Sequence, residues 1–280
     1  MANAPAPKPT TVKKESSSAS SMFSSLAIPI CIAVAIAVYI LILGHPSHFK
    51  GGDPAADATD TFGLVHKGGP IVPIILSCLL MTVTFSIERF VVIGKASGTG
   101  SIDVFVRKIT AFLNNYNIDA ASAECDKQKG SVANVIKSGL KKYREMELEP
   151  NMDVDQKSLA IQKDIEEATS LEMPMLEQNL TIIATLVSIG TLMGLLGTVF
   201  GMIGAFRTMG TGGAPNASEL SAHISEALIN TFLGISTSAI SIIMYNIFTS
   251  KIDKLTYAID ETGFSIVQTF AASHKNNERR

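Results

Sequence analysis

The sequence predicts an all-α, polytopic membrane protein with four transmembrane helices and a cytoplasmic helical bundle. Two observations lead to this fold class. Charged residues make up 17% of the 280-residue chain and hydrophobic residues 46%, whereas soluble globular proteins carry about 25% charged residues. The charges are also unevenly spread, because four windows contain no Asp, Glu, Lys or Arg: 16–49, 68–87, 178–206 and 227–250. Each window holds the roughly 20 mostly apolar residues that a bilayer-crossing helix needs.

The first elements are a polar tail and an apolar span. Residues 1–21 are rich in Ala, Pro, Ser and Lys, a composition typical of disorder. A first transmembrane helix is expected at 22–44. Lys13 and Lys14 before an apolar run also fit a signal peptide, but the polar leader is long and no small-residue cleavage site follows Leu43. These features favour an uncleaved membrane anchor.

Polar segments and further spans alternate along the rest of the chain. The expected order is a loop at 45–69, a span at 70–93, a cytoplasmic helical domain at 94–180, a span at 181–206, a loop at 207–223, a span at 224–250 and a helical tail at 251–280. The helical domain is expected to break near Gly130 and near Pro150. The apolar spacing of its last part, from Gln156 to Gln178, continues into the third span. One long helix is therefore expected to leave the membrane there, and the fourth span likewise extends inward.

The distribution of Lys and Arg predicts the orientation. With the N-terminus inside, the outer loops carry only Lys50, Lys67 and Arg207. Because positive residues gather on the cytoplasmic side of a membrane protein, both termini are expected to face the cytoplasm. The net charge of −2 excludes a strongly basic nucleic-acid binder. No disulfide framework, metal site or cofactor is expected from the cysteines and histidines.

A polar stripe follows the third span at steps of three or four residues, with one longer step at its end. Its positions are Thr181, Thr185, Ser188, Thr191, Gly194, Thr198, Gly201 and Thr208. On a helix they form one nearly continuous face, which should not contact lipid. The stripe fits helix packing, because Gly190 with Gly194 and Gly197 with Gly201 are small-xxx-small pairs. The alternative is a polar lining for an ion path or for a partner helix with an ionisable group, and this span alone favours packing.

The fourth span carries a second set of polar groups. Thr231, Gly234 and Ser238 share a broad face, and Asn230 adds a further polar group. Glu226 lies just before the apolar stretch. A carboxylate at membrane depth is costly and is by default a functional candidate, but an acidic residue in a first helical turn also complements the helix dipole. Both interpretations of Glu226 stay open.

Two motifs in these spans resemble a known family. The strings GLLGTVFGM at 194–202 and ISEALINTFLG at 224–234, with Tyr245-Asn246, resemble the MotA/TolQ/ExbB proton channel family, and its ExbB/TolQ branch in particular. Glu88-Arg89 at the end of the second span also fits the family pattern. GLLGT alone would be weak, but the paired motifs in membrane spans of matching topology are specific. The resemblance covers approximately residues 70–270.

The resemblance implies an inner-membrane homopentamer whose third and fourth spans line a central pore. Transmembrane helices of an ExbD-like single-span partner would lie in that pore and carry the proton on an aspartate, and their motion would pass to a TonB-like periplasm-spanning protein for outer-membrane import. Thr198 and Thr231 match the family's pore-facing threonines, and Glu226 matches its fourth-span glutamate. Thr191 and Asn230 complete the predicted ion pathway. The residues expected to serve helix packing are Gly190, Gly194, Gly197, Gly201 and Gly234.

The chemistry of these residues fits a channel better than an enzyme. A threonine hydroxyl donates and accepts hydrogen bonds, so a ring of threonines suits a carboxylate in either protonation state. No nucleophile with a positioned base is present, and no enzymatic activity is expected. The alternatives are a TolQ-like subunit of a Tol-Pal system, a non-conducting helical scaffold and a channel that acts alone. Two departures from the family pattern are Thr191 and a residue near Ser241 in the places of common prolines, and the additional span at 22–44.

Overall fold

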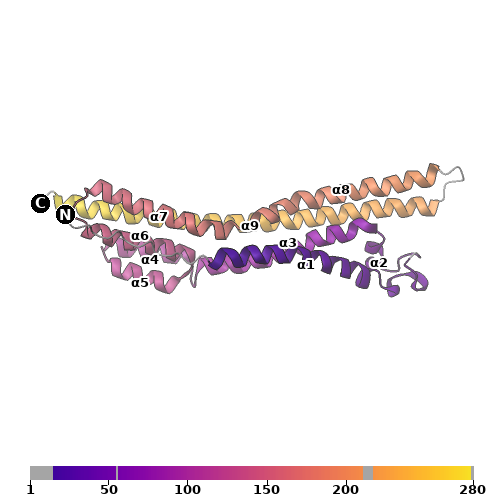
Figure 1. Cartoon of the computed structure of the whole chain (residues 1–280), viewed down its shortest axis with the longest axis horizontal. Coiled ribbons are helices and arrows are strands. Elements are labelled where there is room, and N and C mark those ends of the chain that lie inside the picture. The colour runs from indigo at the N-terminus through magenta and orange to yellow at the C-terminus, as the bar shows by residue number, and fades with distance from the viewer. Residues whose placement is uncertain (1–14, 55, 211–216, 279–280) are drawn as a thin grey trace, which may run out of the picture.

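The computed structural model describes residues 15–54, 56–210 and 217–278, which form an elongated, helical molecule (Figure 1). The α-helices in chain order are α1 (Glu15–Ala37), α2 (Thr61–His66), α3 (Val72–Ser97), α4 (Ile102–Asn114), α5 (Ile118–Gln128), α6 (Gly130–Leu148), α7 (Val154–Glu177), α8 (Leu180–Gly210) and α9 (Ala217–Glu278). A π-helical turn at Val38–Leu43 continues α1, and short 3₁₀ turns lie at Pro46–His48, Lys50–Gly52 and Gly69–Ile71. The described ranges contain no β-strand, and the predicted all-α class is confirmed.

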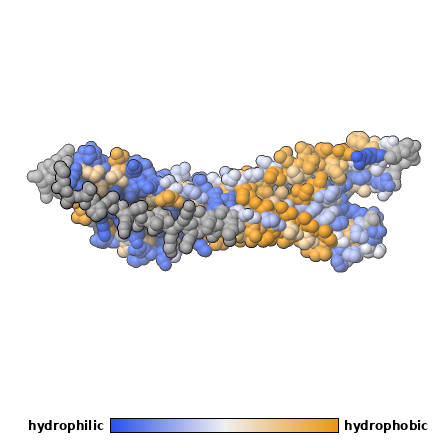
Figure 2. Space-filling model, in the orientation of Figure 1, coloured by the Kyte–Doolittle hydropathy of each residue, from blue (hydrophilic) through white to orange (hydrophobic). Residues whose placement is uncertain are grey.

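Four helical stretches are long and apolar enough to cross a membrane, as predicted. They lie at Phe23–Leu43 and within Gly69–Asn114, Val154–Gly210 and Ala217–His274. Figure 2 shows hydrophobic residues gathered over the part of the molecule where Figure 1 places α1, α3 and α8, with hydrophilic residues toward both ends. The side of the membrane on which each end lies stays a prediction.

The long helix α9 is the spine of the molecule. Its 62 residues span about 90 Å at 1.5 Å per residue. Its first half packs along α8 in an antiparallel hairpin, and its second half packs against α4, α6 and α7 (Figure 1). The latter contacts form a hydrophobic core that includes the fully buried residues Phe105, Ile109, Leu140, Ile161 and Phe270. This core holds together a helical bundle formed by the two segments that were predicted to build it, residues 94–180 and 251–280.

The N-terminal segment and the loop at 45–69 contain more regular structure than their sequences predict. Helix α1 begins at Glu15, so residues 15–21 are helical and not disordered. A helix nucleated by the apolar run extends at low cost into the Ser/Ala-rich residues before it. Residues 1–14 lie outside the described ranges. In the loop at 45–69, the carboxylate of Asp60 caps α2 by accepting a hydrogen bond from the Gly63 amide at 3.0 Å.

The expectation of one continuous helix through the inner membrane surface is wrong. Helix α7 ends at Glu177 and α8 begins at Leu180, and Asn179 between them has a φ of +65°. Periodicity does not reveal this break, because the apolar spacing of Leu176, Leu180 and Ile183 continues across it. The expected breaks near Gly130 and Pro150 agree with the start of α6 and with the gap between α6 and α7.

Candidate functional site

The candidate site is the hairpin of α8 and α9, whose helices pack through small residues. Gly190, Gly194, Gly197 and Gly201 of α8 are buried, and so is Gly234 of α9. A Cβ placed on Gly234 would lie 2.6 Å from the carbonyl oxygen of Gly190 and 2.6 Å from the Cα of Gly194. The two backbones are therefore in contact, as small residues allow. All five predicted packing glycines lie in this interface, which we call the glycine seam.

Two of the predicted threonines lie at the seam and use their hydroxyls within the hairpin. The Thr191 hydroxyl lies 2.8 Å from the Ser238 hydroxyl, which itself donates to the Val187 carbonyl at 2.7 Å. The Thr231 hydroxyl lies 3.1 Å from the carbonyl four residues earlier in α9 and 3.5 Å from the Gly194 carbonyl. These bonds tie α8 to α9 without any charged group.

Thr198 is partly exposed on α8. Its hydroxyl donates to the Leu195 carbonyl at 2.6 Å, so the oxygen keeps lone pairs with which it can accept a hydrogen bond from another molecule. Thr185 and Ser188 on the same stripe are exposed in the single chain. The stripe thus presents hydroxyls to its surroundings and no ionisable side chain from 178 to 206. Such a face can donate and accept hydrogen bonds without adding a charge.

Asn230 lies in the interior of the chain. Its side chain is fully buried, packs against Gly197 and donates from Nδ2 to the Gly68 carbonyl at 2.7 Å. Its Oδ1 is buried without a hydrogen-bond partner among the described residues. Asn230 therefore joins α9 to the turn that precedes α3, and the structure does not bring it to the exposed stripe.

Glu226 contacts the same turn. Its carboxylate lies against Gly69, where a Cβ would come to within 2.1 Å of Oε1, and Gly69 also has a φ of +77°. Its other oxygen lies 3.4 Å from Nδ1 of His223, and only 14% of its side chain is exposed. Glycine is thus required at position 69 both by the positive φ of the backbone and by the lack of room for a Cβ beside Glu226. Sequence reasoning missed Gly69 and His223 as neighbours of Glu226, and the Gly-Gly-Pro turn at 68–70 was the available signal.

The five predicted pathway residues therefore form two groups. Glu226 and Asn230 meet the turn before α3, whereas Thr191, Thr198 and Thr231 lie along the α8/α9 hairpin. The described residues contain no group of three or more His, Cys, Asp or Glu that could hold a metal ion.

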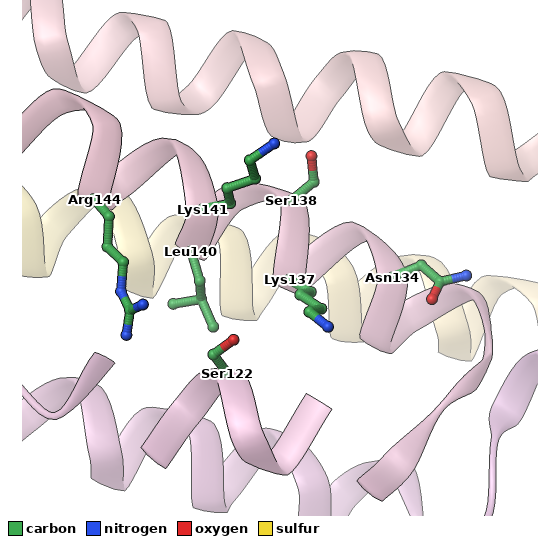
Figure 3. Close-up of a pocket in the computed structure, with 7 residues that line it drawn as sticks. All are labelled: Ser122, Asn134, Lys137, Ser138, Leu140, Lys141 and Arg144. Atoms are coloured by element: carbon green, nitrogen blue, oxygen red, sulfur yellow. The ribbon is translucent and has the colours of Figure 1, made fainter. Parts of the chain in front are cut away.

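A hollow of about 370 Å³ on the helical bundle is one of several concave features lined by polar side chains (Figure 3). Its lining residues are Ser122, Asn134, Lys137, Ser138, Leu140, Lys141 and Arg144. Its three cations are each beside a carboxylate, namely Asp126, Glu145 and Asp119 in that order. Because these charges are already compensated, the hollow does not have the character of an anion site.

Comparisons with known proteins connect the hairpin to a family. Residues 127–261 match the model of the MotA/TolQ/ExbB proton channel family. The chain is 31% identical over 118 residues to the "Putative biopolymer transport protein ExbB-like 3" of Synechocystis, an alignment that covers 41% of this chain and 56% of the relative. It is 24% identical over 204 residues to the "Tol-Pal system protein TolQ" of Pseudomonas aeruginosa, covering 71% of this chain and 87% of that relative.

A further relative is the "Biopolymer transport protein ExbB" of Xanthomonas campestris, 28% identical over 102 residues, which are 36% of this chain and 40% of the relative. The chain thus spans about half the length of two of these three relatives. The matched region begins at the end of α5 and contains the glycine seam and all ten predicted site residues. The chain is thus similar to the MotA/TolQ/ExbB proton channel family over residues 127–261, just under half of its length.

Proposed function

We propose that the chain is an inner-membrane proton-channel subunit that, with an ExbD-like single-span partner, converts proton motive force into mechanical work on a TonB-like protein for outer-membrane import. Five copies would surround the partner helices, with both termini of each copy in the cytoplasm. The family match supports a proton channel, and relatives named for biopolymer transport support the ExbB-like role.

The observation that carries this proposal is the uncharged hydroxyl stripe beside the glycine seam. The seam accounts for the glycines, because they let α8 and α9 touch within one chain. It does not account for the exposed hydroxyls of Thr185 and Ser188 or for the partly exposed Thr198. Polar groups on a membrane helix normally face a protein interior or a water-filled cavity. A partner helix in a central pore supplies that environment.

Replacement of threonine by valine tests the ion pathway, because valine keeps the shape and removes the hydroxyl. We expect Thr198→Val and Thr231→Val to lower proton flux through the reconstituted complex with its partner by about tenfold or more, since a hydrogen bond to a charged group contributes about 1.5–3 kcal/mol. Thr169→Val is the matched control, because Thr169 on α7 also donates to the carbonyl four residues earlier, at 2.7 Å. Normal flux in both stripe variants, with assembly intact, would refute the mechanism.

Glu226 needs a separate variant. Glu226→Gln keeps the contact with Gly69 and removes the charge. We expect a smaller loss of flux than in the threonine variants, because the carboxylate lies at the turn before α3 and not on the stripe. Unchanged flux would assign Glu226 to structure alone.

A TolQ-like role is the second candidate, because the alignment with TolQ covers 87% of that relative. The two roles differ in the periplasmic protein that is moved. Complementation distinguishes them: an ExbB-like subunit restores TonB-dependent import in a strain that lacks its own, and a TolQ-like subunit restores envelope integrity. Cross-links from Thr198 that join only copies of this chain would instead support a non-conducting scaffold.

A further inference from the structure

The joint between α7 and α8 is a break in the helix that is formed by four residues, 177–180. The Gln178 amide donates to the Pro174 carbonyl at 3.0 Å, and Asn179 then adopts a left-handed conformation with a φ of +65°. A left-handed residue ends a helix and leaves the last carbonyls without their usual amide donors. Here those carbonyls belong to Met175 and Leu176. We call this segment the α7/α8 joint.

Arg89 of α3 supplies the missing donors. Its guanidinium donates through Nη1 to the Met175 carbonyl at 3.1 Å and to the Leu176 carbonyl at 3.2 Å. Its remaining nitrogens pair with the carboxylate of Glu88, and Arg89 is fully buried. A buried guanidinium is tolerated only when its donors are satisfied. The geometry of the joint and the ion pair on α3 therefore depend on one another.

Asn179 connects this ion pair to α1. Its Nδ2 donates to Oε2 of Glu88 at 3.3 Å, and its Oδ1 accepts a hydrogen bond from the Ser24 hydroxyl at 2.6 Å. The residue that forms the break therefore also bridges α1 and α3. Asparagine suits both tasks, because it tolerates the left-handed region and carries a donor and an acceptor.

We propose that Asn179 and Arg89 are positioning residues that set the direction in which α8 leaves the joint, and that the additional span α1 takes part through Ser24. The length of α8 makes this direction important. Thr198 lies 19 residues beyond Asn179, about 28 Å along the helix, so a change of about 10° at the joint moves it by roughly 5 Å. Such a shift exceeds the length of a hydrogen bond between the stripe and a partner.

The inference rests on the proposed function only for its consequence for proton flow. The contacts themselves lie within one chain, and two of the three elements that form them, α1 and α3, precede the matched region that begins at residue 127. The joint also explains what the additional span adds beyond membrane anchoring: a hydrogen bond to the break from which the stripe-bearing helix starts.

Cysteine reactivity on α8 tests the inference directly in the full chain. Cys31, Cys78 and Cys125 are buried, so an introduced cysteine reacts against a low background. Two single reporters are compared, Ser188→Cys on the exposed stripe and Leu186→Cys on the buried face. Each variant is labelled with N-ethylmaleimide after its size-exclusion elution volume and its melting temperature are found to equal those of the unsubstituted chain. Ile183→Cys, which is also on the buried face, replaces Leu186→Cys if the latter unfolds.

The reporters are read in chains that also carry Asn179→Gly, Asn179→Ala or Ser24→Ala. Asn179→Gly keeps the left-handed conformation and deletes the bridge, and Ser25→Ala is the control for Ser24→Ala, because Ser25 is the exposed neighbour. We expect Asn179→Gly and Ser24→Ala to lower the ratio of Ser188→Cys to Leu186→Cys labelling rates by about threefold or more, as loss of a hydrogen bond implies. Ser25→Ala should leave the ratio unchanged.

An unchanged ratio of labelling rates in Asn179→Gly would overturn the inference. A change confined to Asn179→Ala would mean that the left-handed conformation acts without the hydrogen bonds of the Asn179 side chain, and this outcome also overturns the inference. The labelling rates need neither partner nor proton flow. If the Thr198→Val experiment refuted the proposed function, the labelling experiment could still be interpreted. A failure of the proposed function can therefore be distinguished from a failure of this inference.

Discussion

The glycine seam makes a quantitative prediction at Gly197. A Cβ at this position would lie 2.2 Å from the Cβ of Asn230 and 2.7 Å from its Cγ. Ordinary contacts between such carbons are about 3.5–4.0 Å, so the two helices would have to separate by about 1 Å or more. Asn230 cannot turn away, because its Cβ is fixed to the α9 backbone and its Nδ2 is bonded to the Gly68 carbonyl.

The expected cost of Gly197→Ala follows from two opposing effects. Overpacking a tight interface costs about 1–3 kcal/mol, and the upper end applies because separation also loosens the contacts at Gly194 and Gly201. Alanine regains about 1 kcal/mol through its helix propensity. A net loss of about 2 kcal/mol in the free energy of unfolding is therefore expected.

Gly94→Ala is the matched control for this substitution. Gly94 lies on α3 with nothing within 4 Å of the added carbon. Only the gain in helix propensity remains there, up to about 1 kcal/mol of stabilisation. Unfolding of the purified full chain in detergent, followed by circular dichroism, should separate the two variants by about 3 kcal/mol. Equal unfolding free energies for the two variants would show that α8 and α9 do not approach as closely as the seam requires.

Three further predictions concern the polar ends of the molecule. Burial raises the pKa of Cys125 to about 12, and the charge of Asp126 adds to the rise. The Cys125 thiol should therefore resist maleimide labelling at pH 8 until the helical bundle unfolds. Rapid labelling of the native protein would contradict this prediction. The Gly63 amide, followed by His48, lowers the pKa of Asp60, so its cap on α2 should persist at neutral pH and weaken as pH falls below about 4. The rate of hydrogen exchange at the Gly63 amide reports how firmly the cap is formed at each pH. Asp60→Asn should keep the cap but lose its pH dependence. An unchanged pH dependence in this variant would show that the Asp60 carboxylate is not its cause. The Tyr143 ring is buried edge-on against the Phe270 ring, with 4.9 Å between the ring centroids, and its hydroxyl lies 3.4 Å from that of Ser273. Tyr143→Ala should therefore lower the free energy of unfolding by about 3–5 kcal/mol, and Tyr143→Phe by about 1 kcal/mol or less. Equal losses for the two variants in thermal unfolding would count against the packing role.

The fold class was predictable from sequence because charge depletion is a property of whole segments. The four membrane helices and the breaks near Gly130 and Pro150 needed no knowledge of tertiary contacts. The α7/α8 joint was not predictable in this way, since apolar residues keep their helical spacing across it and the donors that stabilise it come from Arg89, 86 positions earlier than Met175. Asn179 was the one local hint, as asparagine tolerates a positive φ.

The two groups within the candidate site were hidden for a related reason. Asn230 and Thr231 are consecutive, so periodicity places them about 100° apart on α9 without saying which one faces the rest of the chain. The answer depends on the Gly68 carbonyl, which lies 162 positions away. Glu226 is the same case, because its neighbour Gly69 belongs to the turn before α3.

Helix α3 and the turn before it explain how the hydroxyl stripe is held in place. At the N-terminal end of α3, the turn at Gly68 and Gly69 receives Asn230 and Glu226 of α9. In the middle, the Thr82 hydroxyl lies 2.8 Å from the Ser241 hydroxyl. Toward the C-terminal end of α3, Arg89 holds the carbonyls of the α7/α8 joint. Because the ionisable groups of this region, Glu88, Arg89 and Glu226, are engaged within the chain, the exposed stripe offers hydroxyls alone. Under the proposed function, the group that carries the proton along the stripe therefore comes from another molecule, a partner with its own carboxylate.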